Sequence, residues 1–253
     1  MYGLVSIIMP SYKTGRFIGE TIKSVLNQSY SNWELIIVDD CSNDDTDDVV
    51  AQYVSDKRIR YIKNEVHSGA AISRNRALRE AKGKWIAFLD SDDLWEPDKL
   101  TKQVAFMNDN GYHFSYTNYI EIDENSIPSG KSVTGPKHIT KHGMYNYCWI
   151  GCLTVMYNAE TVGLIQIEDI KKNNDYAMWL KVSKKADCYL LEETLARYRK
   201  RGGSISNQGY IRLIKWHYKL YREADEKNPV SSVVLTVRNC FWGVIKKIKY
   251  VKG

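Results

Sequence analysis

Several features of membrane and secreted proteins are missing from this sequence. No apolar run among its 253 residues approaches the roughly 18 residues that a bilayer-spanning helix requires. A strand is predicted from Leu4 to Met9, so we expect no signal peptide before it. The five cysteines are scattered, and Cys148 and Cys152 have no partner pair at zinc-site spacing. We therefore expect no membrane span and no disulfide scaffold, but buried free thiols in a reducing cytosol.

The usual glycine-rich phosphate-binding motifs are missing as well. No G-x-G-x-x-G follows the first predicted strand, and no G-x-x-x-x-G-K followed by Ser or Thr is present. If a nucleotide binds, a metal ion and cationic side chains must hold its phosphates in place of a glycine loop.

The composition is that of an ordinary globular protein, with 43% hydrophobic and 26% charged residues. The length fits one large domain, or one domain with a small appendage. The net charge of +6 is spread unevenly, because the carboxylate clusters lie in the first half and the tail after Lys181 is basic. This asymmetry permits an anionic partner without identifying it.

Predicted strands and helices alternate along the first half of the chain. Five segments have the apolar pattern of strands: 5–9, 34–38, 59–63, 85–89 and 113–119. Four segments have helical spacing: 17–26, 46–54, 70–81 and 97–108. This alternation predicts an α/β fold, with a mostly parallel central sheet and helices on both of its faces.

Polar clusters stand where three of these strands end. They are Pro10-Ser11-Tyr12, Asp39-Asp40 and Asp90 to Asp93. The carboxyl ends of parallel strands share one edge of the sheet, which is where open α/β sheets bind ligands. Asp90 and Asp92 suit a hard divalent cation that takes its other ligands from water and substrate phosphates. An isolated Asp-x-Asp is more often a solvated acidic turn, so it is the convergence of the clusters that favours a site.

Four blocks in the first 100 residues resemble the successive motifs of family 2 glycosyltransferases. They are Val5–Tyr12, Trp33–Ser42, Ser73–Asn75 and Phe88–Asp93, in the family's order. Each block is weak alone, but the set is specific. The resemblance implies a GT-A fold over 1–225, with a nucleotide-sugar half at about 1–120 and an acceptor half at about 121–225. A basic amphipathic helix at 226–253 would follow as a C-terminal addition.

The resemblance also implies how the nucleoside would bind. Pro10 and Tyr12 would pack against the base and ribose, and Asp40 would accept a hydrogen bond from a uracil N–H. Tyr12 could instead be a plain turn aromatic. Cys41 stands where the family commonly has glycine, so the loop after Asp40 is expected to differ in shape.

The same resemblance assigns the phosphate and metal contacts. Arg74 would lie near the nucleotide phosphates, although a surface ion pair on its helix is the alternative. Asp90 and Asp92 would form the metal motif, with Asp92 closest to a Mg²⁺ or Mn²⁺ ion, and Ser91 between them is a candidate cofactor-binding residue. Arg199 would contact the diphosphate from a basic loop that follows a short strand at 188–191, unless that loop is only a solvated turn.

The candidate catalytic base is Asp175. Tyr176, Trp179 and Leu180 recur at helical spacing, which places Asp175 at the start of a helix, where an Asp is also a good cap. Many family members carry an acidic pair at this position, and the second acid is the base. Here the first acid is replaced by Asn174, while the base position is kept.

Two segments of the second half leave their roles open. Residues 121–140 are polar and predict a loop or hairpin of the kind that acts as a lid. Residues 145–157 are either plain core or one wall of an acceptor pocket.

The C-terminal segment predicts a basic amphipathic helix. Its apolar residues keep helical spacing from Val230 to Ile248, and lysines crowd its end at Lys246, Lys247, Lys249 and Lys252. This stripe either packs on the domain or lies on an anionic membrane surface.

Together these features predict an inverting, metal-dependent glycosyltransferase that uses a UDP-sugar, in the cytoplasm or at the inner membrane face. The absence of Q-x-x-R-W, the signature of processive relatives, predicts transfer of a single sugar. The second half resembles bacterial enzymes of capsule, teichuronic acid or O-antigen synthesis, whose saccharide acceptors are linked to lipid pyrophosphates. No nucleic-acid partner is expected. A non-catalytic nucleotide-sugar-binding scaffold is the alternative, and a sugar nucleotidyltransferase lacks support without a glycine-rich, lysine-bearing start.

Overall fold

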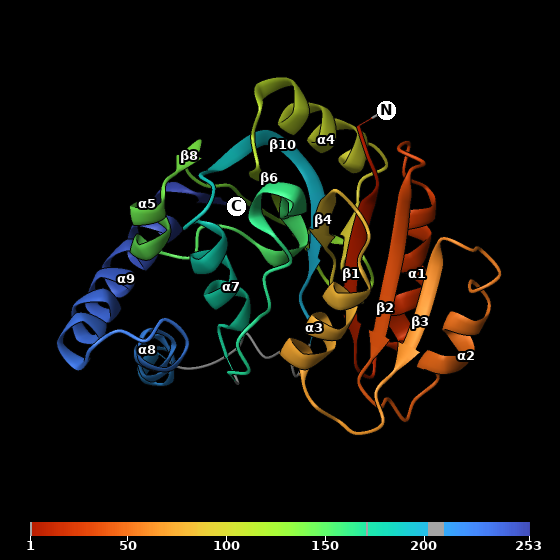
Figure 1. Cartoon of the computed structure of the whole chain (residues 1–253), viewed down its shortest axis with the longest axis horizontal. Coiled ribbons are helices and arrows are strands. Elements are labelled where there is room, and N and C mark those ends of the chain that lie inside the picture. Colours follow the sequence, from red (N-terminus) through yellow and green to blue (C-terminus); the bar gives the residue numbers. More distant parts are fainter. Residues whose placement is uncertain (1, 171, 202–209) are drawn as a thin grey trace.

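The computed structural model of the protein describes residues 2–170, 172–201 and 210–253 (Figure 1). Its core is a mixed sheet of 11 strands. Four parallel strands form the first half of this sheet: β1 (Val5–Ser11), β2 (Trp33–Asp39), β3 (Ile59–Lys63) and β4 (Trp85–Phe88). All seven residues of β1 are buried, because the strand lies between β2 and β4 with helices over both faces. This explains why its sequence is apolar without alternation.

Antiparallel pairing extends the sheet beyond β4. The remaining strands are β5 (Leu94–Trp95), β6 (Phe114–Ile122), β7 (Pro128–Val133), β8 (His138–Ile139), β9 (Met156–Asn158), β10 (Cys188–Arg199) and β11 (Val251–Lys252). The order along the sheet is β11-β7-β6-β9-β4-β1-β2-β3, and β10 runs parallel to β6 outside this path.

Helices cover both faces of the sheet (Figure 1). One face carries α1 (Gly15–Leu26), α2 (Thr46–Ala51) and α4 (Lys99–Asn110). The other face carries α3 (Ala70–Glu80), α5 (Lys141–Asn146), α6 (Ala159–Val162) and α7 (Asn174–Val182). Alternate residues of β1 feed the two cores, since Ile7 packs on the α1 side and Ile8 on the α3 side. The predicted α/β architecture is therefore confirmed.

The remaining elements include a short 3-10 turn, η1 (Cys152–Thr154), and a C-terminal helical group. That group consists of α8 (Tyr210–Lys219), the π-helical turn η2 (Leu220–Ala224) and α9 (Pro229–Lys249). In Figure 1 it forms one flank of the molecule, opposite α2. None of the helices in the described ranges is long and apolar enough to cross a membrane. The C-terminal segment is tied to the sheet, because β11 pairs with β7.

Two predicted segments of the second half take definite forms. Residues 121–140 contain a hairpin, in which β6 turns at 123–127 into the antiparallel β7. The predicted short strand at 188–191 was wrong in length, because β10 continues to Arg199. Pairing with both β6 and β5 holds this extension, so Arg197 and Arg199 are strand residues instead of loop residues. The segment 202–206 of the predicted basic loop lies outside the described residues.

Candidate active site

The polar clusters at the strand ends lie along one edge of the sheet. Ser11, at the end of β1, pairs with Asp39 at the end of β2, and Ile8 pairs with Phe88 near the end of β4. Asp40 and the turn from Asp90 therefore emerge on either side of β1. The α/β topology thus places the three clusters side by side, as the sequence predicts.

Arg74 joins this edge to the start of α7. Its buried guanidinium forms an ion pair with Asp90, and its other amino group donates to Asn174 Oδ1 at 3.4 Å. Asp175, the next residue along, is close enough for the Arg74 charge to lower its pKa. Residues about 100 positions apart in the chain thus share one electrostatic network.

Asp175 lies in the first turn of α7, where its Oδ1 accepts from the Tyr176 amide at 2.8 Å. It is not the residue that caps the helix, because that position belongs to Asn173. Burial raises the pKa of Asp175 and Arg74 opposes the rise, while Asp90 adds to it. A carboxylate with a raised pKa is a stronger general base than an ordinary surface aspartate.

The segment 145–157 belongs to the core and has two cysteines near Asp175. Trp149 and Tyr157 are buried in the core of the α3 side. Burial raises the thiol pKa values of Cys148 and Cys152, and the Asp175 charge raises both further. All five cysteines are free, but only Cys152 and Cys188 are buried, so the prediction of buried thiols holds for these two alone. The segment is thus core that also borders the site.

The turn after β4 concentrates negative charge. Asp92 forms an ion pair with Arg201, whose Nε lies 2.6 Å from Asp92 Oδ2. Burial raises the pKa of Asp92, and Arg201 opposes this while Asp90 adds to it. Burial and the repulsion of Asp92 and Asp90 also raise the pKa of Asp93, well above its usual value. Asp93 Oδ2 is buried without a hydrogen-bond partner among the described residues.

These features fit a divalent cation that is shared with a ligand. No three His, Cys, Asp or Glu side chains in the described part of the chain form a complete cage. The donor set at the turn consists of carboxylate oxygens, which suit Mg²⁺ or Mn²⁺. The crowded negative charge and the orphaned oxygen of Asp93 would both gain from a nearby cation.

Ser91 is turned into the protein. Its side chain is buried, and its Oγ accepts from Thr14 Oγ1 at 2.9 Å. Ser91 therefore fastens the acidic turn to the segment between β1 and α1. Pro10 is also buried, within β1, so only Tyr12 of the first cluster presents an exposed ring, with 39% of its surface accessible.

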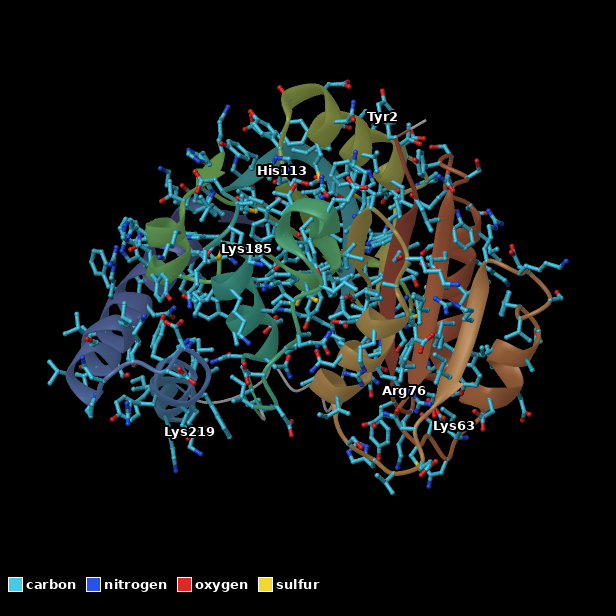
Figure 2. The ribbon with its side chains drawn as sticks, in the orientation of Figure 1. Tyr2, Lys63, Arg76, His113, Lys185 and Lys219 are labelled. Carbon is cyan, nitrogen blue, oxygen red and sulfur yellow. The ribbon has the colours of Figure 1, made fainter. Side chains whose placement is uncertain are left out.

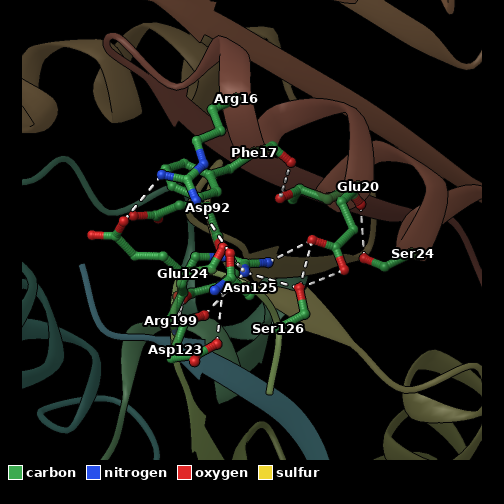
Figure 3. A network of polar contacts seen from close by, with 12 residues as sticks. Arg16, Phe17, Glu20, Ser24, Asp92, Asp123, Glu124, Asn125, Ser126 and Arg199 are labelled. Atoms are coloured by element: carbon green, nitrogen blue, oxygen red, sulfur yellow. Dashed lines mark hydrogen bonds and ion pairs between the residues drawn. The ribbon is translucent and has the colours of Figure 1, made fainter. Parts of the chain in front are cut away.

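Arg199 is held in a cage of protein acceptors (Figure 3). Its side chain is fully buried, and its Nε donates to the Asp92 carbonyl oxygen at 2.6 Å. The guanidinium also pairs with Glu20 Oε2 at 2.7 Å and donates to Ser126 Oγ at 2.9 Å. The geometry thus gives Arg199 a positioning role, in which it ties the acidic turn to α1 and the β6–β7 hairpin. Arg201, whose side chain is 30% accessible, pairs with Asp92 at this turn, and sequence reasoning did not single it out.

Asp39 and Asp40 both organise loops. Asp39 accepts from the Ser42 amide at 2.8 Å and from Ser42 Oγ at 2.6 Å. Cys41, which lies between Asp40 and Ser42, adopts a φ of 64°, in the left-handed region that favours glycine. The loop therefore keeps the backbone conformation that a glycine would adopt most easily, at a cost of about 1 kcal/mol.

Asp40 is buried, and its carboxylate accepts three hydrogen bonds and lies within ion-pair distance of His67. Its Oδ1 accepts from Asn64 Nδ2 at 2.9 Å and from the Ser68 amide at 2.8 Å. Its Oδ2 accepts from the Gly69 amide at 2.7 Å and lies 2.8 Å from His67 Nδ1, whose hydrogen bond is with the Asp40 carbonyl oxygen at 3.3 Å. Burial opposes ionisation, but these donors lower the pKa of Asp40 below its usual value. Sequence reasoning missed His67, because no motif placed it near Asp40.

The arrangement of the sheet is that of the GT-A class. The crystal structure of S. aureus TarS 1-349 in complex with UDP-GlcNAc matches with a TM-score of 0.73 at 19% identity, over 97% of this chain and 74% of that one. The mannosyltransferase PcManGT from Pyrobaculum calidifontis, solved with GDP-Man and Mn²⁺, matches with a TM-score of 0.66 at 16% identity. That match covers 92% of this chain and 68% of that chain. At these identities the likeness shows the fold, and it confirms the predicted GT-A class.

The sequence comparisons are more specific. Residues 6–152 match the family model described as glycosyl transferase family 2. TuaG of Bacillus subtilis (strain 168), named for teichuronic acid biosynthesis, is 43% identical over 224 residues, which is 88% of each chain. WfgD of Escherichia coli is 42% identical over 212 residues, covering 83% of this chain and 82% of that protein. Its name describes a UDP-Glc:α-D-GlcNAc-diphosphoundecaprenol β-1,3-glucosyltransferase. The chain belongs to glycosyl transferase family 2, and the predicted family and glycosyltransferase class are confirmed.

Proposed function

We propose that this protein transfers one sugar from a UDP-sugar to a saccharide carried on a lipid diphosphate, during synthesis of a bacterial surface polysaccharide. The observation that carries the proposal is the Arg74 network, which brings Asp90 and the candidate base Asp175 into one site. The names of similar proteins supply the substrate classes. TarS was solved with UDP-GlcNAc, and WfgD is named for transfer from UDP-Glc to a diphosphoundecaprenol-linked sugar.

In the proposed mechanism, Asp175 takes the proton of an acceptor hydroxyl. The hydroxyl oxygen attacks the anomeric carbon while the bond to the UDP oxygen breaks on the opposite face. An α-linked donor therefore gives a β-linked product, and UDP leaves with the bonding electron pair. The raised pKa of Asp175 suits proton abstraction. Arg74 holds Asp90 in place and adds positive charge where negative charge develops.

The acidic turn is proposed to hold the cofactor. Asp92, assisted by Asp90, would bind Mg²⁺ or Mn²⁺ beside the donor diphosphate. A bound ion supplies Lewis-acid stabilisation of the leaving group. Arg201, which now neutralises Asp92, is the cationic side chain placed to approach the diphosphate. At the other end of the donor, Tyr12 offers a ring to the base and Asp40 an acceptor to its N–H.

We also propose that α9 rests on an anionic lipid surface, where a lipid-linked acceptor would be found. Its apolar stripe does not pack on the domain. Seven of its side chains are between 52% and 77% exposed: Val230, Val233, Val234, Val237, Phe241, Val244 and Ile248. The helix instead buries Ser232, Thr236 and Asn239 against the protein. A large exposed apolar patch marks a contact surface.

Charge favours lipid over a second copy of the chain as the occupant. The exposed cations Arg238, Lys249 and Lys252 flank the stripe, so two such faces would repel each other while an anionic bilayer would attract either one. Lys246 does not contribute, contrary to the sequence-based interpretation. Its Nζ is buried and donates to the Cys148 and Trp149 carbonyl oxygens at 3.2 Å and 2.9 Å. The proposed location is the cytoplasmic face of the membrane.

A transfer assay tests this function. The protein is incubated with Mn²⁺, a panel of UDP-sugars and a synthetic GlcNAc-diphospholipid, and UDP release and product mass are measured. Acceptor-dependent UDP release with one added sugar supports the proposal. Binding of UDP-sugars without transfer to any saccharide acceptor would favour the scaffold alternative instead.

A further inference from the structure

We propose that His67 is an intramolecular competitor for the base pocket: its imidazole holds the place of the nucleotide base in the free enzyme and sets the affinity for the donor. The inference rests on the proposed use of a UDP-sugar and on Asp40 and Tyr12 as its base-binding residues. It concerns a residue to which neither the motifs nor the mechanism above assigns a role.

The imidazole makes the two contacts that a uracil base needs from this pocket. Its Nδ1 lies 2.8 Å from Asp40 Oδ2 at ion-pair distance and hydrogen-bonds the Asp40 carbonyl oxygen at 3.3 Å, and its ring stacks on Tyr12 with 4.3 Å between the centroids. The planes are inclined by 33°, which is a tilted stack. A flat heterocycle with one hydrogen-bond partner on Asp40 and one face on Tyr12 is what uracil would present there. The two rings therefore cannot occupy these positions together.

The three hydrogen-bond donors to the Asp40 carboxylate belong to the fixed frame of the fold. Ser68 and Gly69 donate from the backbone at the start of α3. Asn64 is buried and also donates to Ser73 Oγ at 3.0 Å. Arg76 of α3, which lies beside Lys63 at the end of β3 (Figure 2), donates to Asn64 Oδ1 at 2.9 Å and holds it further. These three donors should keep their hydrogen bonds to Asp40 when a ligand binds.

His67 differs from these donors because it is an exposed side chain. Its side chain is 57% accessible, whereas that of Asp40 is 3% accessible. Rotation of the imidazole away from the pocket frees one acceptor position on Asp40 and one face of Tyr12, and leaves the frame unchanged. A base without an N–H at that edge would leave the buried carboxylate short of a donor, which costs affinity.

Competition lowers the apparent affinity by the fraction of molecules in which the pocket is open. If His67 occupies the pocket about nine-tenths of the time, its removal strengthens UDP binding about tenfold. Ligands that reach only the acidic turn, such as pyrophosphate with Mn²⁺, should be indifferent to His67. The increase in UDP affinity should come from faster association. The dissociation rate should not change, because the UDP complex does not contain the His67 contact.

The test uses the full chain with His67→Ala and a matched control, Val66→Ala, which alters a 68% exposed neighbour in the same loop. Binding of UDP and of pyrophosphate is measured by titration calorimetry in Mn²⁺, and UDP association by stopped flow. We expect His67→Ala to bind UDP several-fold more tightly through faster association, with pyrophosphate affinity unchanged. Val66→Ala should behave like the wild type.

Two results would overturn the proposal. Weaker UDP binding by His67→Ala, through faster dissociation, would mean that His67 stacks on the bound base. Unchanged UDP affinity would mean that the Asp40 contact does not compete. Failure of the proposed function is a separate result, because it appears in the wild type as an absence of UDP binding or of sugar transfer.

Discussion

Arg74 on α3 and Asp90 at the end of β4 form an ion pair in which the arginine is buried and the carboxylate is partly exposed, at 31%. Both residues lie in the first half of the chain, and the second contact of Arg74, to Asn174 Oδ1 at 3.4 Å, links the pair to the start of α7 beside Asp175. Arg74 Nε has no hydrogen-bond partner among the described residues, so the guanidinium is held mainly through its two amino groups.

Replacing Arg74 should shift the acid limb of the pH–rate profile. Arg74 lowers the pKa of Asp175 against the effect of burial, so Arg74→Gln should move that pKa upward. Since the base acts only when ionised, kcat should begin to fall at a higher pH than in the wild type. Arg74→Lys keeps the positive charge and should restore most of the shift. An acid limb that stays in place in Arg74→Gln would show that Arg74 does not act on the base.

Asp92→Asn should abolish metal-dependent transfer without weakening the fold. The folded state raises the pKa of Asp92, so the ionised carboxylate opposes folding, and stability should rise as pH falls through that pKa. The amide removes this charge, so the Tm should stay the same or increase by a few degrees. Calorimetric titration of UDP with and without Mn²⁺ should show that the variant has lost the metal-dependent part of the affinity. Full wild-type activity in EDTA would contradict the metal assignment.

The proposed contact between Asp40 and uracil predicts which nucleotide the protein prefers. UDP should bind at least about tenfold better than CDP or ADP, because neither cytosine nor adenine offers a ring N–H donor to Asp40. Asp40→Asn is the milder test, since it keeps the shape of a side chain that orders the start of α3, and it should reduce the difference. Equal affinities of UDP and ADP for the wild type would remove this role from Asp40.

The α9 surface predicts salt-sensitive membrane binding. The protein should float with anionic liposomes at low salt and be released at high salt, since each lysine or arginine near the surface is worth roughly 1 kcal/mol. Changing Arg238, Lys249 and Lys252 to Gln, or Val237 and Phe241 to Ser, should reduce flotation with little change in Tm. Val54→Ser is a control in the turn that follows α2, where the side chain is 45% exposed, and α2 lies on the flank opposite α9 (Figure 1); this variant should have no effect. A wild-type protein that never floats with anionic liposomes would end the proposal.

The parts of this account that the sequence predicted are those with local signals. Apolar runs and helical spacing defined the strands and helices of the first half, and topology then placed Asp40 and Asp90 along one edge. The contacts of Asp40 with His67, and of Asp92 with Arg201, depend on how loops return across the sheet. No periodicity encodes such contacts.

Charged residues led to a wrong expectation for part of the fold. Arg197 and Arg199 were expected in a loop, yet both lie in β10 and pair with β6. Arg199 can be buried there because Glu20, Ser126 and the Asp92 carbonyl oxygen accept hydrogen bonds from its donors. A helix in which Ser232 and Asn239 face inward and Val237 faces outward reverses the usual pattern. The sequence predicted that α9 is a helix, but it did not predict which face of α9 packs against the rest of the protein.

The most direct test of the central claim is the turnover of Asp175→Asn with the donor and lipid-linked acceptor that the wild type uses. The substitution removes the proposed base but keeps the size of the side chain in the first turn of α7. We predict that kcat falls by about 10²-fold or more, while the affinity for the donor and the Tm change little. Near-normal turnover would contradict the account, because the acceptor hydroxyl would then lose its proton without Asp175.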